Sequence, residues 1–180
     1  PMSRSLIGRE NAPVILVDIG DLVTSYSIVD RHYLRLNQSI DVGGAALTTA
    51  IVDALRVSRE EAERLKHEQG LEGTSDGRGA EIAAAMRPTL RSLVERAQSL
   101  LRLYEQKSQR QVGAIVLIGG GAKLRGLPRF WTDATGIPAA IGNPWKGIRV
   151  PAVLGAHLRS TGPSFAVAVG LALREFEHSE

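Results

Sequence analysis

The sequence predicts an α/β domain in which helices cover a mixed β-sheet, with a smaller subdomain attached. Three stretches carry this prediction. Val14–Val17, which leads into Asp18, and Gly113–Ile118 are apolar runs of the kind found in strands that are buried on both faces. Between them, residues 79–110 repeat apolar side chains at helical spacing, which predicts helical structure with one buried face.

The first part of the chain is predicted to form a three-stranded meander. Val14–Val17 runs into a turn that carries Asp18 and Gly20, and Ser25–Asp30 then alternates polar and apolar residues. Residues 34–37 alternate in the same way, which predicts a third strand with one apolar face.

Helices are predicted after the meander. Leu47–Leu55 has apolar residues on one helical face, so we expect a helix packed on the sheet. Ser58 and Glu61 form a capping box that opens a second helix, and Gly70 is placed to end it. Pro88 interrupts the long helical pattern and removes a backbone hydrogen bond, which predicts either two helices or one kinked helix.

The last third of the chain begins with a glycine run, Gly119–Gly121, directly after an apolar strand. Pro128 lies near the start of a short predicted helix that Gly136 ends, and Ala139–Ile141 is a brief predicted strand. Phe165–Glu177 is predicted to be the final helix, with an apolar face that needs a docking surface.

Composition excludes several functional classes. The apolar fraction of 43% and charged fraction of 23% are ordinary for a folded domain and argue against disorder. No apolar run reaches the ~18 residues needed to span a bilayer and no signal-peptide core is visible, so a cytoplasmic location is expected. Zero cysteines exclude disulfides and thiolate sites, and a net charge of +3 spread along the chain gives little support for nucleic-acid binding.

Two glycine-containing turns are candidate binding sites. In D-I-G-D-L-V-T, residues 18–24, the glycine lets backbone amides approach an anion, and Asp18 can hold a hydrated magnesium ion. The run G-G-G-A at residues 119–122 is the second. Each also has an ordinary interpretation, because turn aspartates and tight strand-to-helix turns are common. The four histidines show no metal-ligand spacing, and no catalytic constellation is visible.

Four motifs in a fixed order resemble one family. They are D-I-G-D-L-V-T, E-R-L-K at residues 63–66, I-V-L-I-G-G-G-A-K-L-R-G at 115–126 and G-P-S-F-A-V-A-V-G-L-A-L-R at 162–174. Together they resemble the second lobe of the actin and heat-shock-chaperone ATPase superfamily, and within it the PilM family of type IV pilus machines. The resemblance runs from about residue 13 to residue 176.

The resemblance implies an actin-like, ribonuclease H-like second lobe. Residues 1–43 and 111–180 would form its core subdomain, and residues 44–110 an inserted smaller subdomain. In this superfamily the phosphates are clamped between two lobes, and no segment here supplies the first lobe. The resemblance therefore implies half of a site for ATP and Mg²⁺, with weak binding and without robust hydrolysis.

The resemblance also assigns roles to single residues, while no residue is assigned a catalytic role. At the phosphates, Asp18 would organise water and magnesium, Gly20 and Asp21 would approach the phosphates and ribose, and Thr24 would support the loop. On the second helix, Glu63 and Lys66 would reach the adenosine, with His67 beside them. The glycines Gly119, Gly120 and Gly121 would lie against the base and ribose. On an exposed helix, a charge pair such as Glu63 and Lys66 is equally typical of a solvated face.

Leu22 departs from the family pattern, which has a glycine or a small residue at this place, and Val23 replaces a common threonine. A leucine there is expected to point into the phosphate space or force the loop outward, at a cost on the order of 1–3 kcal/mol. Replacing Leu22 with glycine is accordingly predicted to strengthen ATP binding once the missing lobe is supplied.

The leading functional prediction is a cytoplasmic scaffold of a type IV pilus or related secretion platform, held at the inner membrane through partners. A PilN-like protein is the implied partner, although the groove for its N-terminal tail lies in the family's first half and is expected to be missing. Two alternatives stay open. One is a nucleotide hydrolase completed by a partner lobe or a dimer, and the other is an FtsA-like cell-division tether, which the lack of a C-terminal amphipathic membrane helix disfavours.

Overall fold

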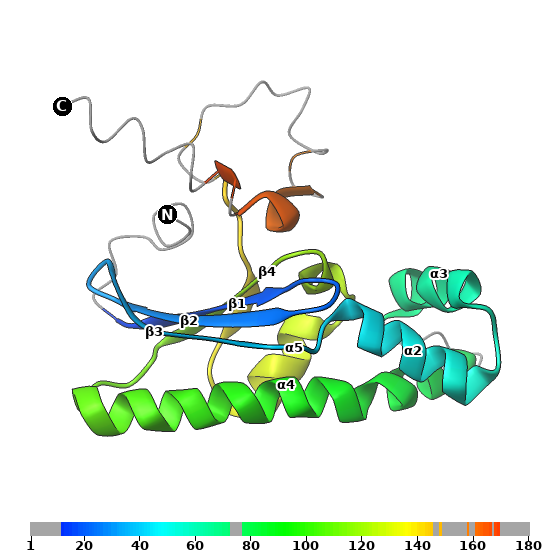
Figure 1. The fold of residues 1–180 in the computed structure, drawn as a ribbon, viewed down its shortest axis with the longest axis horizontal. Coiled ribbons are helices and arrows are strands. Elements are labelled where there is room, and N and C mark those ends of the chain that lie inside the picture. The colour runs from blue at the N-terminus through cyan, green and yellow to red at the C-terminus, as the bar shows by residue number, and fades with distance from the viewer. Residues whose placement is uncertain are drawn as a thin grey trace.

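A mixed sheet of five strands forms the centre of the molecule (Figure 1). The computed structural model describes residues 12–72, 77–145, 148, 158, 161–166, 168 and 169. The strands are β1 (Val14–Ile19), β2 (Thr24–Asp30), β3 (Tyr33–Ile40), β4 (Ala114–Ile118) and β5 (Ala139–Ile141), in the order β3-β2-β1-β4-β5. The pairs β1–β2 and β2–β3 are antiparallel, and β1–β4 and β4–β5 are parallel. The predicted meander and mixed sheet are confirmed.

Helices cover one face of the sheet and extend beyond one end of it. They are α2 (Gly44–Leu55), α3 (Arg59–Gln69), α4 (Arg78–Ser108), the 3₁₀ turn η1 (Gly121–Lys123) and α5 (Leu127–Thr135). In Figure 1, α4 and α5 lie along the sheet, whereas α2 and α3 lie past the strand ends. The expectation that α2 packs on the sheet is wrong, because its apolar face meets α4 and α3 instead. Most of the predicted final helix, residues 165–177, lies outside the described residues.

The predicted helix ends are confirmed where local signals set them. The backbone amide of Glu61 donates to the Ser58 hydroxyl at 3.1 Å, as a capping box requires, and Gly70 follows the last residue of α3. Gly136 ends α5 in the left-handed region, with φ 73°. These signals are short-range, which explains why the sequence alone located them.

The helix α4 continues through Pro88 as a single element of 31 residues. Met86 and Leu90 are fully buried on either side of the proline, so tertiary packing offsets the lost hydrogen bond. Further along, the Tyr26 hydroxyl donates to the Leu93 carbonyl at 3.0 Å and ties α4 to β2. Among the described residues, no helix is both long and apolar enough to cross a membrane.

A small polar cluster joins the C-terminal end of α4 to the end of β2, and we call it the Asp30 cluster. The Tyr104 hydroxyl donates to Asp30 Oδ2 at 2.9 Å, and the Arg110 guanidinium pairs with Asp30 Oδ1. Asp30 is buried, so these two contacts compensate the loss of water around its carboxylate. The cluster lies at the end of the sheet opposite the β1–β2 turn.

The side chains on the two faces of β1 pack into different clusters, and this determines on which side of the sheet Asp18 lies. Ile15, Val17 and Ile19 belong to the main core on the helix-covered face, while Val14 and Leu16 belong to a small cluster on the other face. Because side chains alternate along a strand, Asp18 leaves β1 on the face opposite α4. The backbone that follows Ile19 then turns toward α2.

Candidate functional site

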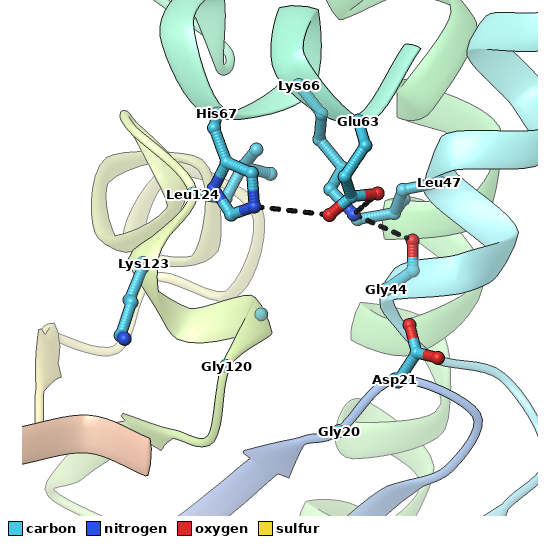
Figure 2. A pocket seen from close by; sticks show the side chains of 11 residues that line it. Gly20, Asp21, Gly44, Leu47, Glu63, Lys66, His67, Gly120, Lys123 and Leu124 are labelled. Carbon is cyan, nitrogen blue, oxygen red and sulfur yellow. Dashed lines mark hydrogen bonds and ion pairs between the residues drawn. The ribbon is translucent and has the colours of Figure 1, made fainter. Parts of the chain in front are cut away.

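A pocket of about 200 Å³ lies where the β1–β2 turn, the α2 and α3 helices and the loop through η1 converge (Figure 2). Its lining consists of Gly20, Asp21, Gly44, Leu47, Glu63, Lys66, His67, Gly120, Gly121, Lys123 and Leu124. Of the predicted site residues, the pocket therefore brings together Gly20, Asp21, Glu63, Lys66, Gly120 and Gly121. Asp18, Thr24 and Gly119 lie outside its lining.

The first wall is the β1–β2 turn, which is held against the start of α2. The amides of Gly44 and Ala45 donate to the carbonyls of Gly20 and Asp21, each at 2.9 Å. A Cβ atom at Gly43 would lie 2.5 Å from the Asp21 carbonyl oxygen, so only glycine permits this approach. At the base of the turn, the buried Thr24 hydroxyl donates to the Val42 carbonyl at 2.7 Å.

Leu22 points away from this wall. Its side chain is 70% exposed and does not line the pocket, and its φ is not positive. The exposed side chain and the ordinary φ of Leu22 give no sign of the expected backbone strain, and its entry into the phosphate space of a two-lobed site stays a prediction. The adjacent Val23 is also exposed.

The second wall is the glycine run, whose three members play different structural roles. Gly119 has φ 85°, and a Cβ atom there would overlap the Asp18 carboxylate. A Cβ atom at Gly121 would overlap the Ile19 side chain. At Gly120, by contrast, no atom lies within 4 Å of the Cβ position. Gly119 and Gly121 therefore let the loop pack on β1, while Gly120 leaves its backbone bare toward the pocket.

Asp18 lies beside the glycine run rather than inside the pocket. Burial raises the pKa of its carboxyl group, because the charged form loses water. No group of three or more His, Cys, Asp or Glu residues that would hold a metal occurs in the described part of the chain. Mg²⁺ in phosphate sites, however, often takes only one or two carboxylates, with water and phosphate oxygens as the other ligands. A single desolvated carboxylate fits that pattern.

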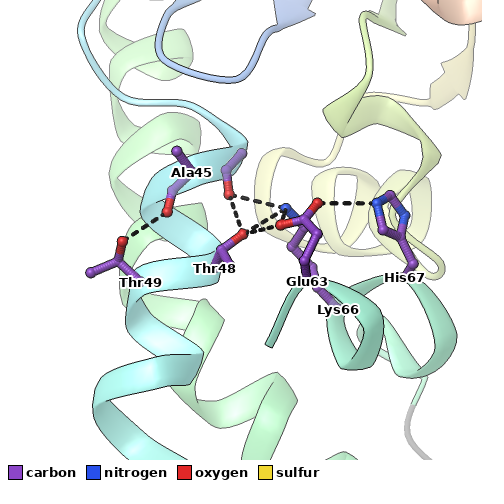
Figure 3. Close-up of polar contacts among 7 residues, drawn as sticks. Ala45, Thr48, Thr49, Glu63, Lys66 and His67 are labelled. Carbon is purple, nitrogen blue, oxygen red and sulfur yellow. Dashed lines mark hydrogen bonds and ion pairs between the residues drawn. The ribbon is translucent and has the colours of Figure 1, made fainter. Parts of the chain in front are cut away.

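The third wall is α3. Its side chains Glu63, Lys66 and His67 form a connected polar group with Thr48 of α2, which we call the Glu63 cluster (Figure 3). Lys66 Nζ donates to Glu63 Oε2 and Thr48 Oγ1, both at 2.8 Å. The Thr48 hydroxyl lies 2.5 Å from Glu63 Oε2, and His67 Nε2 lies 3.1 Å from Glu63 Oε1. These contacts fix the side chain of Glu63 at the pocket.

The ionisation of Glu63 reflects two opposing effects. Partial burial raises the pKa of its carboxyl group, but hydrogen bonds from Lys66 and Thr48, together with the positive charges nearby, outweigh it and hold the pKa below the usual range. Glu63 is therefore a carboxylate at neutral pH. The pocket consequently presents a fixed acceptor on α3 opposite the bare backbone of Gly120 (Figure 2).

A model of the family described as type IV pilus assembly protein PilM matches residues 5–176. The chain belongs to the PilM family. Its fold also matches a chain of a PilM–PilN type IV pilus biogenesis complex, with a TM-score of 0.76 and 28% identity over 96% of this chain and 47% of that one. The actin-like fold expected from the sequence is thereby confirmed.

The chain is also similar to proteins with other names. The cell division protein FtsA of Rhizobium meliloti is 30% identical over 176 residues, covering 86% of this chain and 38% of FtsA. The cell shape-determining protein MreB of Escherichia coli is 28% identical over 156 residues, covering 71% of this chain and 45% of MreB. MreB5 of Spiroplasma citri bound to ADP shares the fold, with a TM-score of 0.73 and 16% identity over 98% of this chain and 57% of that one. This PilM-family chain spans less than half the length of the FtsA and MreB relatives.

Five residues that line the pocket were not predicted as site residues: Gly44, Leu47, His67, Lys123 and Leu124. Of these, His67 was expected only to lie beside Glu63 and Lys66. Lys123 and Leu124 lie inside the glycine-rich motif, so that motif carried a signal for them. No sequence signal pointed to Gly44 and Leu47, because their place in the pocket depends on how α2 packs beside the β1–β2 turn. Proximity of this kind is set by tertiary structure.

Proposed function

We propose that this chain is an assembly component of a type IV pilus platform whose pocket forms one side of an ATP site. The observation that carries the proposal is the convergence of the β1–β2 turn, the bare Gly120 backbone and the Glu63 cluster around one pocket. The volume of about 200 Å³ is smaller than the ~300–1,000 Å³ of pockets that enclose a drug-sized ligand. That difference supports a surface that covers a nucleotide from one side.

Each wall has a proposed role. Gly20 and Asp21 lie where the phosphates approach, Gly120 and Gly121 lie against the base and ribose, and Glu63 accepts hydrogen bonds from the nucleoside. Gly119 and Thr24 support these loops from outside the pocket. Asp18 holds magnesium-bound water next to the phosphates, and a bound cation offsets the cost of burying its charge.

The proposed partner is a PilN-like membrane protein, which places the chain at the cytoplasmic side of the inner membrane without membrane insertion of its own. The match to a PilM–PilN complex supports this partner. We further propose the division of the lobe into a core of residues 1–43 and 111–180 and a smaller part of residues 44–110. The helix α4 belongs to the second part by sequence and packs along the sheet of the first.

Calorimetric titration of the chain with ATP, with and without Mg²⁺, tests the nucleotide site. We expect weak, Mg²⁺-dependent binding that Gly120→Val reduces at least about tenfold, because the new side chain projects into the open space at this position. Ala140→Val, which adds the same branched side chain on the exposed strand β5, is the matched control and should bind like the wild type. Equal affinity in the Gly120→Val and wild-type proteins would remove the glycine run from the site.

A further inference from the structure

We propose that the outer edge of β3, together with the flank of α4 beside it, is a docking surface for an extended acidic segment of a partner protein, which pairs with β3 as an added strand. The inference goes beyond the proposed nucleotide site, because neither β3 nor α4 lines that pocket. We call this region the β3 edge surface, and its side chains are Tyr33, Leu34, Arg35, Arg96, Leu103 and Lys107.

The first observation is that β3 is an edge strand with a free outer side. It is eight residues long and is the last strand of the sheet, next to β2. In the part of the chain that the structure describes, no segment pairs with its other side. The register with β2 skips Arg35, as in a β-bulge, and Leu36–Ile40 beyond it pair regularly. An edge of this kind offers backbone N–H and C=O groups to an added strand.

The second observation is that apolar side chains lie exposed along this edge. Tyr33 and Leu34, which follow the β2–β3 turn, are 67% and 61% exposed, and Leu103 of α4 is 40% exposed. One flank of α4 faces α5, because Gln98 donates to the Ala134 carbonyl at 3.0 Å. Successive helical residues turn by about 100°, which puts Leu103 on the opposite flank. That flank lies toward β3, against which α4 packs (Figure 1).

The third observation is that the surface is basic, which determines the kind of partner. Arg96 and Lys107 lie on the same flank of α4 as Leu103, and both are exposed, as is Arg35. Arg35 lies over the Tyr33 ring, 5.4 Å from its centroid, and none of the three cations forms an ion pair with a described residue. The strand β3 contains no acidic residue. Carboxylates of a partner would therefore gain three counter-charges without breaking an ion pair between described residues.

The shape and charge of the surface favour a protein segment over a lipid bilayer or a second copy of the chain. The turn between β2 and β3 consists of Arg31 and His32, which are exposed and have positive φ. Polar side chains therefore form the tip of the hairpin, and insertion into a bilayer would require Arg31 to enter ahead of Tyr33 and Leu34. A second copy that presented the same surface would bring like charges together. A segment with carboxylates and apolar side chains matches both features.

Titration of the ¹⁵N-labelled chain with a blocked peptide of about ten residues, alternating glutamate and valine, tests the surface. We expect millimolar binding that shifts the amide signals of Leu36–Ile40 and slows their hydrogen exchange, because a paired edge is protected from solvent. Arg96→Glu/Lys107→Glu should weaken binding about tenfold. Arg87→Glu/Arg91→Glu, the same charge change on another exposed part of α4, is the matched control and should bind like the wild type.

The same peptide with all its amide nitrogens methylated separates strand pairing from charge attraction. It keeps the carboxylates but has no N–H donors, so it should not bind. Equal binding of the methylated peptide would overturn strand addition, and equal affinities of the two double variants would overturn the role assigned to the charges. Absence of any shift with the unmethylated peptide at millimolar concentration would overturn the whole proposal.

Two further arms test the other occupants. Phosphatidylglycerol vesicles should leave the signals of Tyr33 and Leu34 unchanged, and so should raising the concentration of the chain alone. Changes caused by the vesicles and not by the peptide would replace the partner segment with a lipid surface. Changes caused by concentration alone would replace it with a second copy. None of these measurements uses ATP, so their failure leaves the nucleotide site standing.

Discussion

The Asp30 cluster and the Glu63 cluster both contain a buried charge, yet their surroundings differ. Asp30 lies inside packed structure, with its side chain only 7% exposed and both oxygens taken by Tyr104 and Arg110. In the Glu63 cluster the buried partner is Lys66, and the carboxylate is half exposed at a pocket. The buried charge of Asp30 therefore stabilises the fold at one end of the sheet. At the other end, the buried charge of Lys66 holds a hydrogen-bond acceptor, Glu63, at the pocket. The two clusters differ because Glu63 shares an open pocket with the exposed backbone of Gly120, whereas Asp30 is enclosed by packed side chains.

The largest effect on stability is expected at the Asp30 cluster. Asp30→Ala removes the carboxylate that Tyr104 and Arg110 both contact, so we expect a loss on the order of 3 kcal/mol in the free energy of unfolding. Urea unfolding followed by circular dichroism measures it, with the exposed Asp53→Ala as control. ATP affinity should stay unchanged, because the pocket lies at the other end of the sheet. If Asp30→Ala costs no more than Asp53→Ala, the comparison between the clusters fails.

A smaller effect is expected where the glycine run meets β1. In Gly121→Ala the new methyl group overlaps Ile19, which is β-branched and buried, so we expect a destabilisation of about 1–3 kcal/mol. Gly120→Ala, one residue away, meets open space and should leave the unfolding midpoint close to that of the wild type. Thermal unfolding of the two variants compares them directly. Equal midpoints would contradict the distinct roles assigned to these glycines.

The smallest effect is expected at Leu22. Because its side chain lies in solvent, Leu22→Gly should change ATP affinity by less than about twofold. The substitution adds backbone freedom to the unfolded chain, so a stability loss of about 0.4–1 kcal/mol is expected. Calorimetry on Leu22→Gly and Leu22→Ala checks the first expectation. A clear rise in affinity for the glycine variant would support the expectation that Leu22 crowds the phosphates.

The sequence predicted those features that depend on neighbouring residues. The apolar runs of β1 and β4, the capping box at Ser58 and the end of α5 at Gly136 were all located correctly. Features that depend on distant contacts were not. At Pro88 the sequence left two helices or one kinked helix open, and the structure has a single helix, α4, with buried residues on both sides of the proline.

The site shows the same division between local and tertiary information. Motifs identified the glycine run and the charged pair on α3, but no motif distinguishes Gly120 from its two neighbours. That difference depends on which glycine faces β1. The direction of Leu22 and the burial of Lys66 likewise depend on α2, which binds the turn on one side and Lys66 on the other.

The helix α4 is more deeply buried than α3, so the two helices are expected to differ in how often they open locally. Leu90, Leu93 and Ala97 are fully buried against the sheet, so amide hydrogens in this part of α4 exchange with solvent only when the whole domain unfolds. In α3, only Ala62, Leu65 and Lys66 are buried. This helix has few contacts to lose and is expected to open and close many times within one folded lifetime. The wall that α3 contributes to the pocket is therefore expected to open more often than α4, and a ligand held by Glu63 would slow exchange in α3 while leaving α4 unchanged.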